Sequence, residues 1–223
     1  MSEITLIKAT PWDTAVFGVP TWELLEYSPA ALLTTQTAGH YTIRVDPLVD
    51  KRLLHEFEFY YCDTLIEPRC DAVRLRSSWC VDATISKDVD TASALSICHG
   101  AFSHGRFHRD FNLSYSAADL RYDNWLKQLL DMGHVYGLYW RGEMAGFIGC
   151  RENNLILHAL SEKYRGKGLS KYWWTALCIE LFRNGYQTIT SSVSTSNAAV
   201  VNLYASLGFS FYNPQDIYHR FVR

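Results

Sequence analysis

The pattern of hydrophobic and polar residues in the first third of the chain predicts a small α/β unit. Short runs rich in β-branched and aromatic residues are typical of strands, and four such runs occur here: residues 4–9, 21–27, 40–45 and 59–68. Two segments between them have the spacing of short helices, residues 31–39 and 50–59. We expect this unit to end near residue 85.

The middle of the chain predicts a helix followed by an antiparallel sheet. An acidic N-cap signal opens residues 88–102, and a clearer helix covers residues 119–133, where Gly133 is a stop signal. Tight turns then separate three strand-like runs. These runs predict a three-stranded antiparallel meander: residues 134–140, 143–152 and 155–160.

The last quarter of the chain alternates helices and strands. Trp173, Leu177 and Leu181 fall four residues apart and give one broad apolar face, which predicts a buried helix. A new strand, a second helix and a terminal pair of strands follow, at residues 183–193, 197–208, 209–212 and 216–223. The order predicts an α/β chain with a mainly antiparallel start and one β-helix-β crossover, divided into domains at residues 1–85 and 86–223.

Composition and charge narrow the class of protein. The chain has 223 residues, of which 48% are hydrophobic, so it can bury a full core. A formal net charge of -2 gives no broad basic field, which argues against nucleic acid and anionic membranes as partners. We find no targeting segment or membrane-spanning run and expect a cytoplasmic protein. The six cysteines form no C-x-x-C pair, so we expect reduced thiols.

One short stretch, KYRGKGLSKYWW at residues 163–174, carries candidate chemistry. It places Gly166 and Gly168 at a turn between a predicted strand and a predicted helix, where unpartnered N–H groups and the helix dipole attract an anion. Arg165 and Lys167 add positive charge. The spacing fits neither the Walker loop nor the Rossmann fingerprint, which would require a third glycine at Lys171. A solvated basic turn that caps a helix and binds nothing is the alternative.

This stretch resembles the pyrophosphate loop of the GNAT superfamily of N-acetyltransferases. The loop corresponds to Arg165, Gly166, Lys167, Gly168, Leu169 and Ser170. At its last position Ser170 replaces the small apolar residue that is usual in the family. A second stretch, SNAAVVNLYASLGF, is similar to a later GNAT segment through Asn197, Tyr204, Gly208 and Phe209. The resemblance implies a GNAT fold of the α/β (α+β) class and acetyl-CoA as the cofactor. The GNAT fold has a mixed, mainly antiparallel sheet with flanking helices. In this chain we expect a smaller, partial GNAT-like α/β unit to precede that fold.

The resemblance also implies roles for individual residues. It makes Tyr204 the acid that protonates the leaving thiolate, and a phenol with a pKa of about 10 can do this for a thiol with a pKa of about 8.5. The strands at 146–152 and 155–160 are expected to splay apart and admit the pantetheine arm, which pairs with backbone groups near Leu160. Asn197 is either an N-cap, a cofactor contact or both. Glu152 and His158 are candidate general bases, although a neutral amine needs no base.

A histidine-rich stretch before the predicted central helix has two interpretations. His99, His104 and His108 suggest a metal, but Gly105 breaks the helix and no carboxylate or cysteine completes a ligand set, so we expect no metal. In GNAT folds this region lines the acceptor pocket. The resemblance therefore makes Arg106, Phe107 and His108 candidate substrate-binding residues, with a plain surface loop as the alternative.

Within the superfamily, the chain resembles the dTDP-fucosamine acetyltransferases in features along its whole length. These include WDTAVFGV near the start, AFSHGRF before the predicted helix, RENN at the end of the second meander strand and DIYHRFVR at the end. The resemblance implies N-acetylation of a nucleotide-linked aminosugar by a homodimer. Acetylation of another amine and a non-catalytic acyl-CoA-binding module are the two alternatives.

Overall fold

The computed structural model describes residues 5–223, which form two compact units. Unit 1 runs to Leu65 and also contains Ser103–Arg121 and Asn213–Arg223, whereas unit 2 contains Ile66–Phe102 and Tyr122–Tyr212. Neither unit is continuous in sequence, because segments far along the chain return to the first unit. Their limits therefore do not coincide with the predicted division between residues 85 and 86.

Unit 1 is built on the strand order β1-β2-β3-β11. The strands are β1 (Ile7–Ala9), β2 (Thr21–Leu24), β3 (Gly39–Val45) and the end of β11 (Ser210–Val222). The β2–β3 pair is parallel and the other pairs are antiparallel. Three short helices accompany them, α1 (Pro11–Phe17), α2 (Pro29–Leu33) and α3 (Arg52–Glu56). Fully buried Leu32, Tyr41, Ile43 and Leu54 form the centre of the core of this unit.

The predicted elements of unit 1 are confirmed in part. Helix α1 was not expected, although Pro11 at its start and Gly18 after its end are typical helix boundaries. The expected terminal pair of strands is wrong, because β11 is one continuous strand. Asn213, with a φ of 47°, and Pro214 lie inside this strand, where the sequence suggested a break.

Unit 2 is built on the strand order β4-β9-β8-β7-β6-β5. The strands are β4 (Tyr60–Asp71, which begins in unit 1), β5 (Ala83–Ser86), β6 (Val135–Trp140), β7 (Glu143–Arg151), β8 (Asn154–Leu160) and β9 (Thr188–Ser191), and β10 (Val193–Ser194) pairs with β4. The predicted meander is confirmed as β6-β7-β8. Strand β5, which the sequence did not predict, extends it antiparallel to β6.

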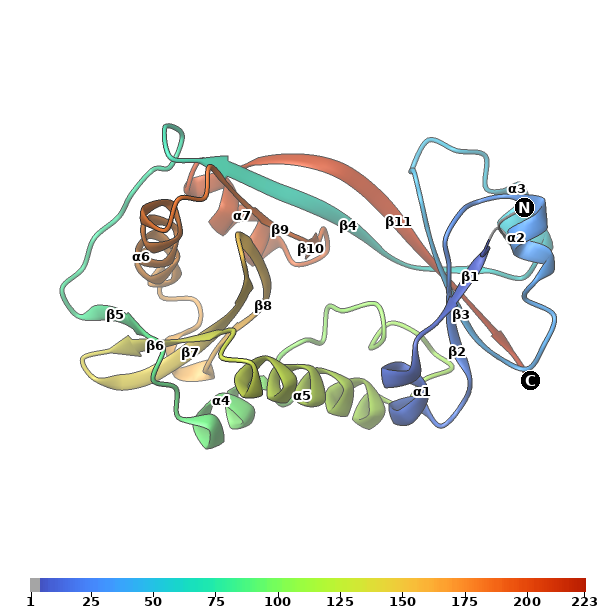
Figure 1. Cartoon of the computed structure of the whole chain (residues 1–223), viewed down its shortest axis with the longest axis horizontal. Helices are drawn as coiled ribbons and strands as arrows, with labels where there is room; N and C mark the ends of the chain where they lie inside the picture. Colours follow the sequence, from blue (N-terminus) through green and yellow to red (C-terminus); the bar gives the residue numbers. More distant parts are fainter. Residues whose placement is uncertain (1–4) are drawn as a thin grey trace. The chain divides into compact units, whose positions relative to one another are not determined.

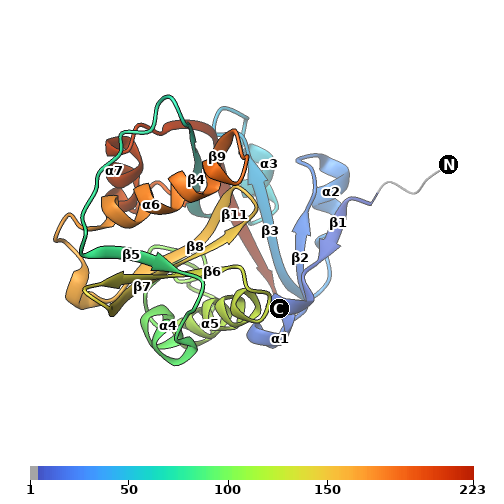
Figure 2. The same cartoon turned by 60° about the vertical axis from the view of Figure 1, so that its left-hand side comes forward.

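Helices cover both faces of the unit 2 sheet (Figures 1 and 2). On one face α6 (Ser170–Arg183) and α7 (Ala198–Ser206) pack against the sheet through a core that includes Trp173, Leu177 and Tyr204. On the other face lie α4 (Thr91–Cys98) and the end of α5 (Tyr115–Asp131), with Leu126 and Leu129 buried. The expected mixed, mainly antiparallel sheet with flanking helices is confirmed, and β8-α6-β9 is the expected crossover, with β8 and β9 parallel.

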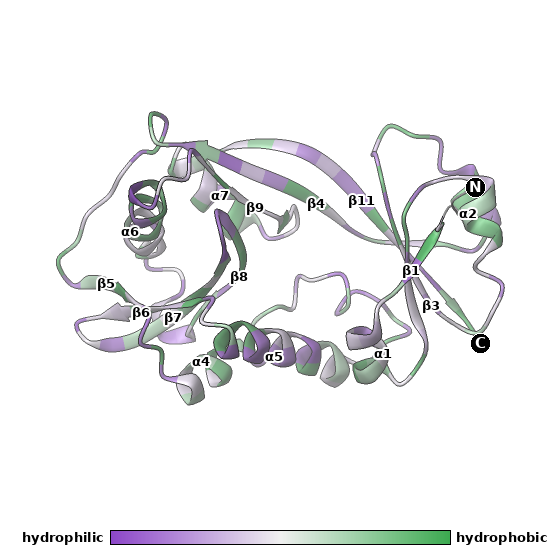
Figure 3. Cartoon of the chain, viewed as in Figure 1, coloured by the Kyte–Doolittle hydropathy of each residue, from purple (hydrophilic) through white to green (hydrophobic). Residues whose placement is uncertain are grey.

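Helix α6 confirms the predicted apolar face. Trp173, Leu177 and Leu181 are buried, as are Trp174 and Cys178 beside them. Figure 3 shows hydrophobic and hydrophilic residues on the same helix, as expected for a helix with one face on a sheet. Within residues 5–223, every helix is too short or too polar to cross a membrane.

Candidate functional site

A β-bulge in β8 determines which way His158 points. Gly149 faces Leu157 while the next residue, Cys150, faces Leu155, so Ile156 is an extra residue in β8. Leu155 packs with the α6 face of the sheet, but Ile156 and Leu157 both pack with the α5 face. Because strand residues alternate again after the bulge, His158 returns to the face covered by α6 and α7.

The same strand separates from its parallel neighbour. β8 pairs with β9 only at Asn154–Thr190 and Leu155–Ser191, although β8 continues to Leu160. The expectation that β7 and β8 splay apart is therefore wrong, because these two strands stay paired from Arg151–Asn154 to Gly146–Leu160. A hairpin with a tight turn holds β7 and β8 together, whereas β8 and β9 are joined only through a helix.

The end of β8 presents backbone groups on the side where β9 is missing. Ser161 donates its N–H to the carbonyl of Ala145 at 2.9 Å, which places the Gly146–Leu160 pair between two ladder hydrogen bonds. The N–H and C=O of Leu160 therefore point away from β7. The C=O of Leu160 accepts a hydrogen bond of 2.8 Å from Nε of Arg165. This part of β8 offers a strand edge to an extended molecule that carries amides.

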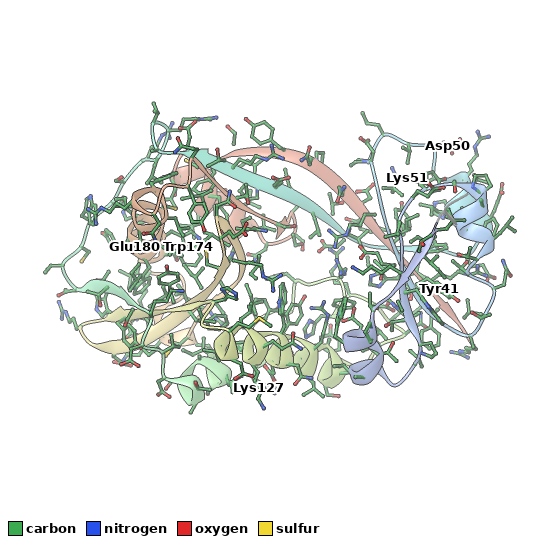
Figure 4. All side chains as sticks on the ribbon, in the orientation of Figure 1. Tyr41, Asp50, Lys51, Lys127, Trp174 and Glu180 are labelled. Carbon is green, nitrogen blue, oxygen red and sulfur yellow. The ribbon has the colours of Figure 1, made fainter. Side chains whose placement is uncertain are left out.

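Two of the predicted site residues meet at this edge. The hydroxyl of Tyr204, on α7, lies 3.3 Å from Nε2 of His158. The ring of Trp174 meets the ring of His158 edge to face, with 5.0 Å between the ring centroids. Trp174 lies on the side of α6 toward β8 (Figure 4). Because Tyr204 and Trp174 are almost completely buried, the hydroxyl and the imidazole are held in one geometry.

Ser191 contributes a further contact at the last residue of β9. Its hydroxyl donates a hydrogen bond of 2.7 Å to the carbonyl of Leu155, where β8 and β9 make their last pairing. The side chain of Ser191 also acts to lower the pKa of Tyr204. Tyr204 is thus held from β8 by His158, and Ser191 holds the end of β9 to β8.

Burial sets the protonation states of the pair. It lowers the pKa of His158 to about 4, so the imidazole is neutral at neutral pH. Burial also raises the pKa of Tyr204 well above its ordinary value, and the side chain of Ser191 offsets part of this rise. At neutral pH the site therefore holds a protonated phenol beside an imidazole that can accept a proton.

The loop before α6, residues 165–169, has the geometry that the sequence predicts. Gly166 and Gly168 have φ values of 70° and 66°, a left-handed conformation that favours glycine. A Cβ atom built on either glycine meets nothing within 4 Å, so both glycines face open space. Leu169, the N-cap residue, makes no side-chain capping bond, and the first N–H groups of this 14-residue helix remain available to an anion.

The other residues predicted for the cofactor lie in this loop, at the start of α6 and at the start of α7. Arg165 and Lys167 are exposed, and Ser170 is the first residue of α6. Asn197 is the N-cap of α7, and its side chain accepts a hydrogen bond from the N–H of Val200. The capping role of Asn197 is confirmed, and its contact with the cofactor stays a prediction.

The second candidate base lies elsewhere on the strand. Glu152 is exposed in the turn between β7 and β8, with a φ of 53°, and its backbone carbonyl accepts a hydrogen bond from the thiol of Cys150. Among the described residues, its carboxylate makes no ion pair or hydrogen bond. The structure therefore brings His158, and not Glu152, to Tyr204.

The three predicted substrate-binding residues all belong to unit 1. Arg106 and Phe107 line a pocket in that unit. His108 is buried instead, with Nε2 at 2.8 Å from Asp119. His99 belongs to unit 2, where Nδ1 is 2.8 Å from Asp123, so the histidines of this stretch do not gather around one point.

A histidine and aspartate cluster that the sequence did not indicate lies in unit 1. Within residues 5–223, one group of side chains has metal-ligating atoms close enough together to hold a single ion: His40, Asp110 and His219. Both histidines, however, are at hydrogen-bonding distance from the same oxygen of Asp110, at 2.8 and 2.7 Å. Nδ1 of His219 donates there, and its buried Nε2 has no partner. A metal on Nδ1 would force a proton onto that buried Nε2, so we interpret the cluster as hydrogen-bonded.

Sequence reasoning missed Trp174 and Ser191 as parts of the site. Trp174 follows Trp173 in the predicted helix, and the sequence indicates only an apolar helical residue at that position. Ser191 lies in a short run of threonine and serine residues, TITSS, that is common in strands. Neither position carries a local signal, because the contact between the two residues and Tyr204 depends on the packing of three separate elements.

Comparison with known proteins finds one family model that matches part of the chain. Residues 105–209 match the model of the acetyltransferase (GNAT) family, and this segment contains the α6 loop, His158 and Tyr204. No curated protein matches the sequence.

Several solved structures have a similar fold. A GCN5-related N-acetyltransferase from Sphaerobacter thermophilus has a TM-score of 0.64 at 10% identity, over 97% of this chain and 76% of its own. A tandem GNAT protein from the clavulanic acid biosynthesis pathway has a TM-score of 0.56 at 12% identity, over 92% and 76%. A GNAT-family acetyltransferase from Colwellia psychrerythraea has a TM-score of 0.56 at 13% identity, over 90% and 78%. At these identities the likeness shows the fold alone.

Proposed function

We propose that the chain, which has the GNAT fold and matches the GNAT family model over residues 105–209, is an N-acetyltransferase that uses acetyl-CoA and transfers the acetyl group directly, with Tyr204 as the general acid. The observation that carries this proposal is the pairing of Tyr204 with His158 at 3.3 Å, beside the edge where β8 leaves β9. A protein that only bound an acyl-CoA would need neither a phenol nor a neutral imidazole there.

The α6 loop fits the diphosphate of the cofactor. Its two left-handed glycines leave open space for a bulky group, and the helix behind them directs unpartnered N–H groups toward it. We assign the diphosphate to the backbone of residues 166–170, with Arg165 and Lys167 supplying positive charge. The N–H of Leu160, on the side of β8 that β9 does not cover, would donate to an amide carbonyl of the pantetheine arm. When bound, acetyl-CoA supplies the acetyl group as a reactive thioester.

The residues at the edge divide the proton transfers between them. Neutral His158 accepts a proton from the attacking amine, either directly or through water. Tyr204 donates its proton to the departing sulfur, a transfer that its raised pKa makes uphill in the resting enzyme. A protonated His158, only 3.3 Å from the phenol, favours the tyrosinate and so makes the donation easier. The proton can then return from His158 to Tyr204.

We propose a nucleotide-linked aminosugar as the acceptor. The support is the similarity of sequence features along the chain to aminosugar acetyltransferases, together with unit 1, which acetylation of a simple amine does not require. Arg106, Phe107 and His108 are proposed as acceptor-binding residues. A homodimer and a cytoplasmic location also stay predictions.

A thiol-release assay tests this function. Purified protein is mixed with acetyl-CoA and with nucleotide-linked aminosugars, free amino acids or peptides, and the release of free thiol is followed. We expect release to depend on the acceptor and to be fastest with the aminosugars. Fast release with amino acids or peptides alone would overturn the acceptor assignment, and tight binding of acetyl-CoA without turnover of any acceptor would overturn the catalytic one.

A further inference from the structure

Two neighbouring tryptophans of α6 differ in what their indole N–H groups do. Trp173 donates its N–H to the carbonyl of Tyr139 on β6 at 2.8 Å. Trp174 is 2% exposed, yet its Nε1 has no hydrogen-bond partner among residues 5–223. A buried N–H without an acceptor costs free energy, and a phenylalanine at the same place would avoid that cost. The N–H of Trp174 therefore does not stabilise the resting fold through a hydrogen bond.

This N–H lies beside the pair of residues that transfers protons. The rings of Trp174 and His158 meet at an interplanar angle of 79°, with 5.0 Å between their centroids. Nε2 of the same imidazole is 3.3 Å from the hydroxyl of Tyr204. All three residues belong to unit 2, and Trp174 and Tyr204 belong to one buried cluster. An unused donor is thus held next to the group that gives up a proton.

The electrostatic effect of Trp174 on the phenol points in the same direction. Burial raises the pKa of Tyr204, whereas the side chains of Ser191 and Trp174 act to lower it. A neutral side chain lowers the pKa of a phenol by favouring the phenolate. The indole has one polar hydrogen, that on Nε1, so this effect requires the N–H to be directed toward the phenol oxygen.

An indole is suited to this task because it is a hydrogen-bond donor and not an acceptor. When Tyr204 passes its proton to the departing sulfur, the O–H bond breaks and its electron pair stays on the phenol oxygen. The indole keeps its own proton and donates a hydrogen bond to that charged oxygen. Hydrogen bonds to an ionised acceptor are shorter and roughly twice as strong as those between neutral groups. A donor that is unused at rest and engaged when charge develops lowers the barrier.

We propose that Trp174 acts through Tyr204 in the acetyl transfer, as a positioning residue whose indole N–H donates a hydrogen bond to the phenolate that forms when the proton leaves. The inference rests on the proposed function, because it requires Tyr204 to be the general acid. It adds a third side chain to the pair of Tyr204 and His158, and it gives the buried N–H a role that packing does not give it.

An analogue of tryptophan without the N–H tests this role. In β-(3-benzothienyl)alanine a sulfur atom replaces the N–H while the two-ring shape is kept, and stop-codon suppression introduces it at position 174 alone. We expect kcat to fall about tenfold, as for the loss of one hydrogen bond to a charged group. The dissociation constant of acetyl-CoA and the midpoint of thermal unfolding should stay at their wild-type values. An unchanged kcat would overturn the inference.

The same analogue at position 173 is the matched control. There it removes the hydrogen bond to the carbonyl of Tyr139, so we expect a lower midpoint of thermal unfolding and an unchanged kcat. If kcat falls equally with the analogue at position 173 and at position 174, the substitution disturbs α6 in general and the inference is wrong.

A double-mutant cycle with Tyr204→Phe separates this inference from the proposed function. Tyr204→Phe has no phenol oxygen, so the analogue at position 174 should lower its kcat no further. A second tenfold fall would mean that the indole acts on another group, and the inference would fail while Tyr204 remained the general acid. A full kcat in Tyr204→Phe alone would instead overturn the proposed function, and the inference with it.

Discussion

The hydroxyl of Tyr204 and Nε2 of His158 lie 3.3 Å apart, although the two residues are 46 positions apart in sequence. The contact depends on the bulge at Ile156, which turns His158 toward the helices that cover the sheet. It also depends on the early end of β9, which leaves the strand edge beside both residues without a neighbour. A proton donor and a proton acceptor therefore meet where an extended ligand can lie.

The first prediction concerns the phenol. Tyr204→Phe removes the proton donor and keeps the ring that packs on Phe209, so we expect kcat to fall by about 10²-fold or more. The dissociation constant of acetyl-CoA should stay the same, because the α6 loop is unchanged. Steady-state kinetics and calorimetry measure the two quantities. Tyr186→Phe, a partly buried tyrosine of the same unit, is the matched control and should keep full activity. An undiminished kcat in Tyr204→Phe would remove the phenol from the mechanism.

The second prediction concerns pH. Because burial lowers the pKa of His158 from 6.5 to about 4, the imidazole remains an acceptor throughout the neutral range. We expect the acidic limb of kcat/KM that reports His158 to lie near pH 4, well below the value for an ordinary histidine and separate from the limb that protonation of the acceptor amine causes at higher pH. His158→Gln should lower kcat/KM by about 10² at neutral pH and abolish this acidic limb.

Glu152→Gln is the control for this pH profile. The carboxylate is exposed in the turn before β8, so the variant should keep both the rate and the acidic limb of the wild type. If Glu152→Gln loses the acidic limb of kcat/KM and His158→Gln keeps it, Glu152 and not His158 is the general base.

Much of unit 2 could be predicted from the sequence, because its signals are local. The apolar row of α6, the meander turns and the glycines of the α6 loop each occupy a short window, and the structure bears out all three. The bulge at Ile156 could not be predicted, because LILHAL reads equally well as a regular strand. The prediction that β7 and β8 splay apart was wrong for the same reason. The length over which β8 pairs with β9 depends on packing between distant segments, which the sequence of one strand does not reveal.

The third prediction concerns stability in acid. Burial lowers the pKa of His219 to about 3, although its hydrogen bond to Asp110 acts in the opposite direction. Between pH 6.5 and about 3 the unfolded chain binds a proton at this residue that the folded chain does not bind. The free energy of unfolding should therefore be intact above pH 6.5 and should decrease as the pH falls through this range, by at most about 1.4 kcal/mol per pH unit from this group.

Urea unfolding at a series of pH values measures this slope. His219→Asn should fold with lower stability at neutral pH but with a smaller loss on acidification, because the titrating group is gone. His104→Asn, in an exposed loop, should keep the slope of the wild type. If His219→Asn loses stability on acidification as steeply as the wild type, another group is responsible for the acid sensitivity.

The fourth prediction tests the α6 loop with two glycines in the same conformation. Gly168 and Gly142 have φ values of 66° and 82°, and a Cβ on either meets nothing within 4 Å. Valine at either position should therefore cause a similar backbone strain of about 1–2 kcal/mol. Only Gly168 faces the proposed diphosphate, whereas Gly142 lies in the β6–β7 turn. We expect Gly168→Val to weaken acetyl-CoA binding in calorimetry at least tenfold and Gly142→Val to leave it unchanged. If Gly168→Val and Gly142→Val bind acetyl-CoA with equal affinity, the diphosphate binds elsewhere, because the space in front of Gly168 would then remain open to solvent in the complex.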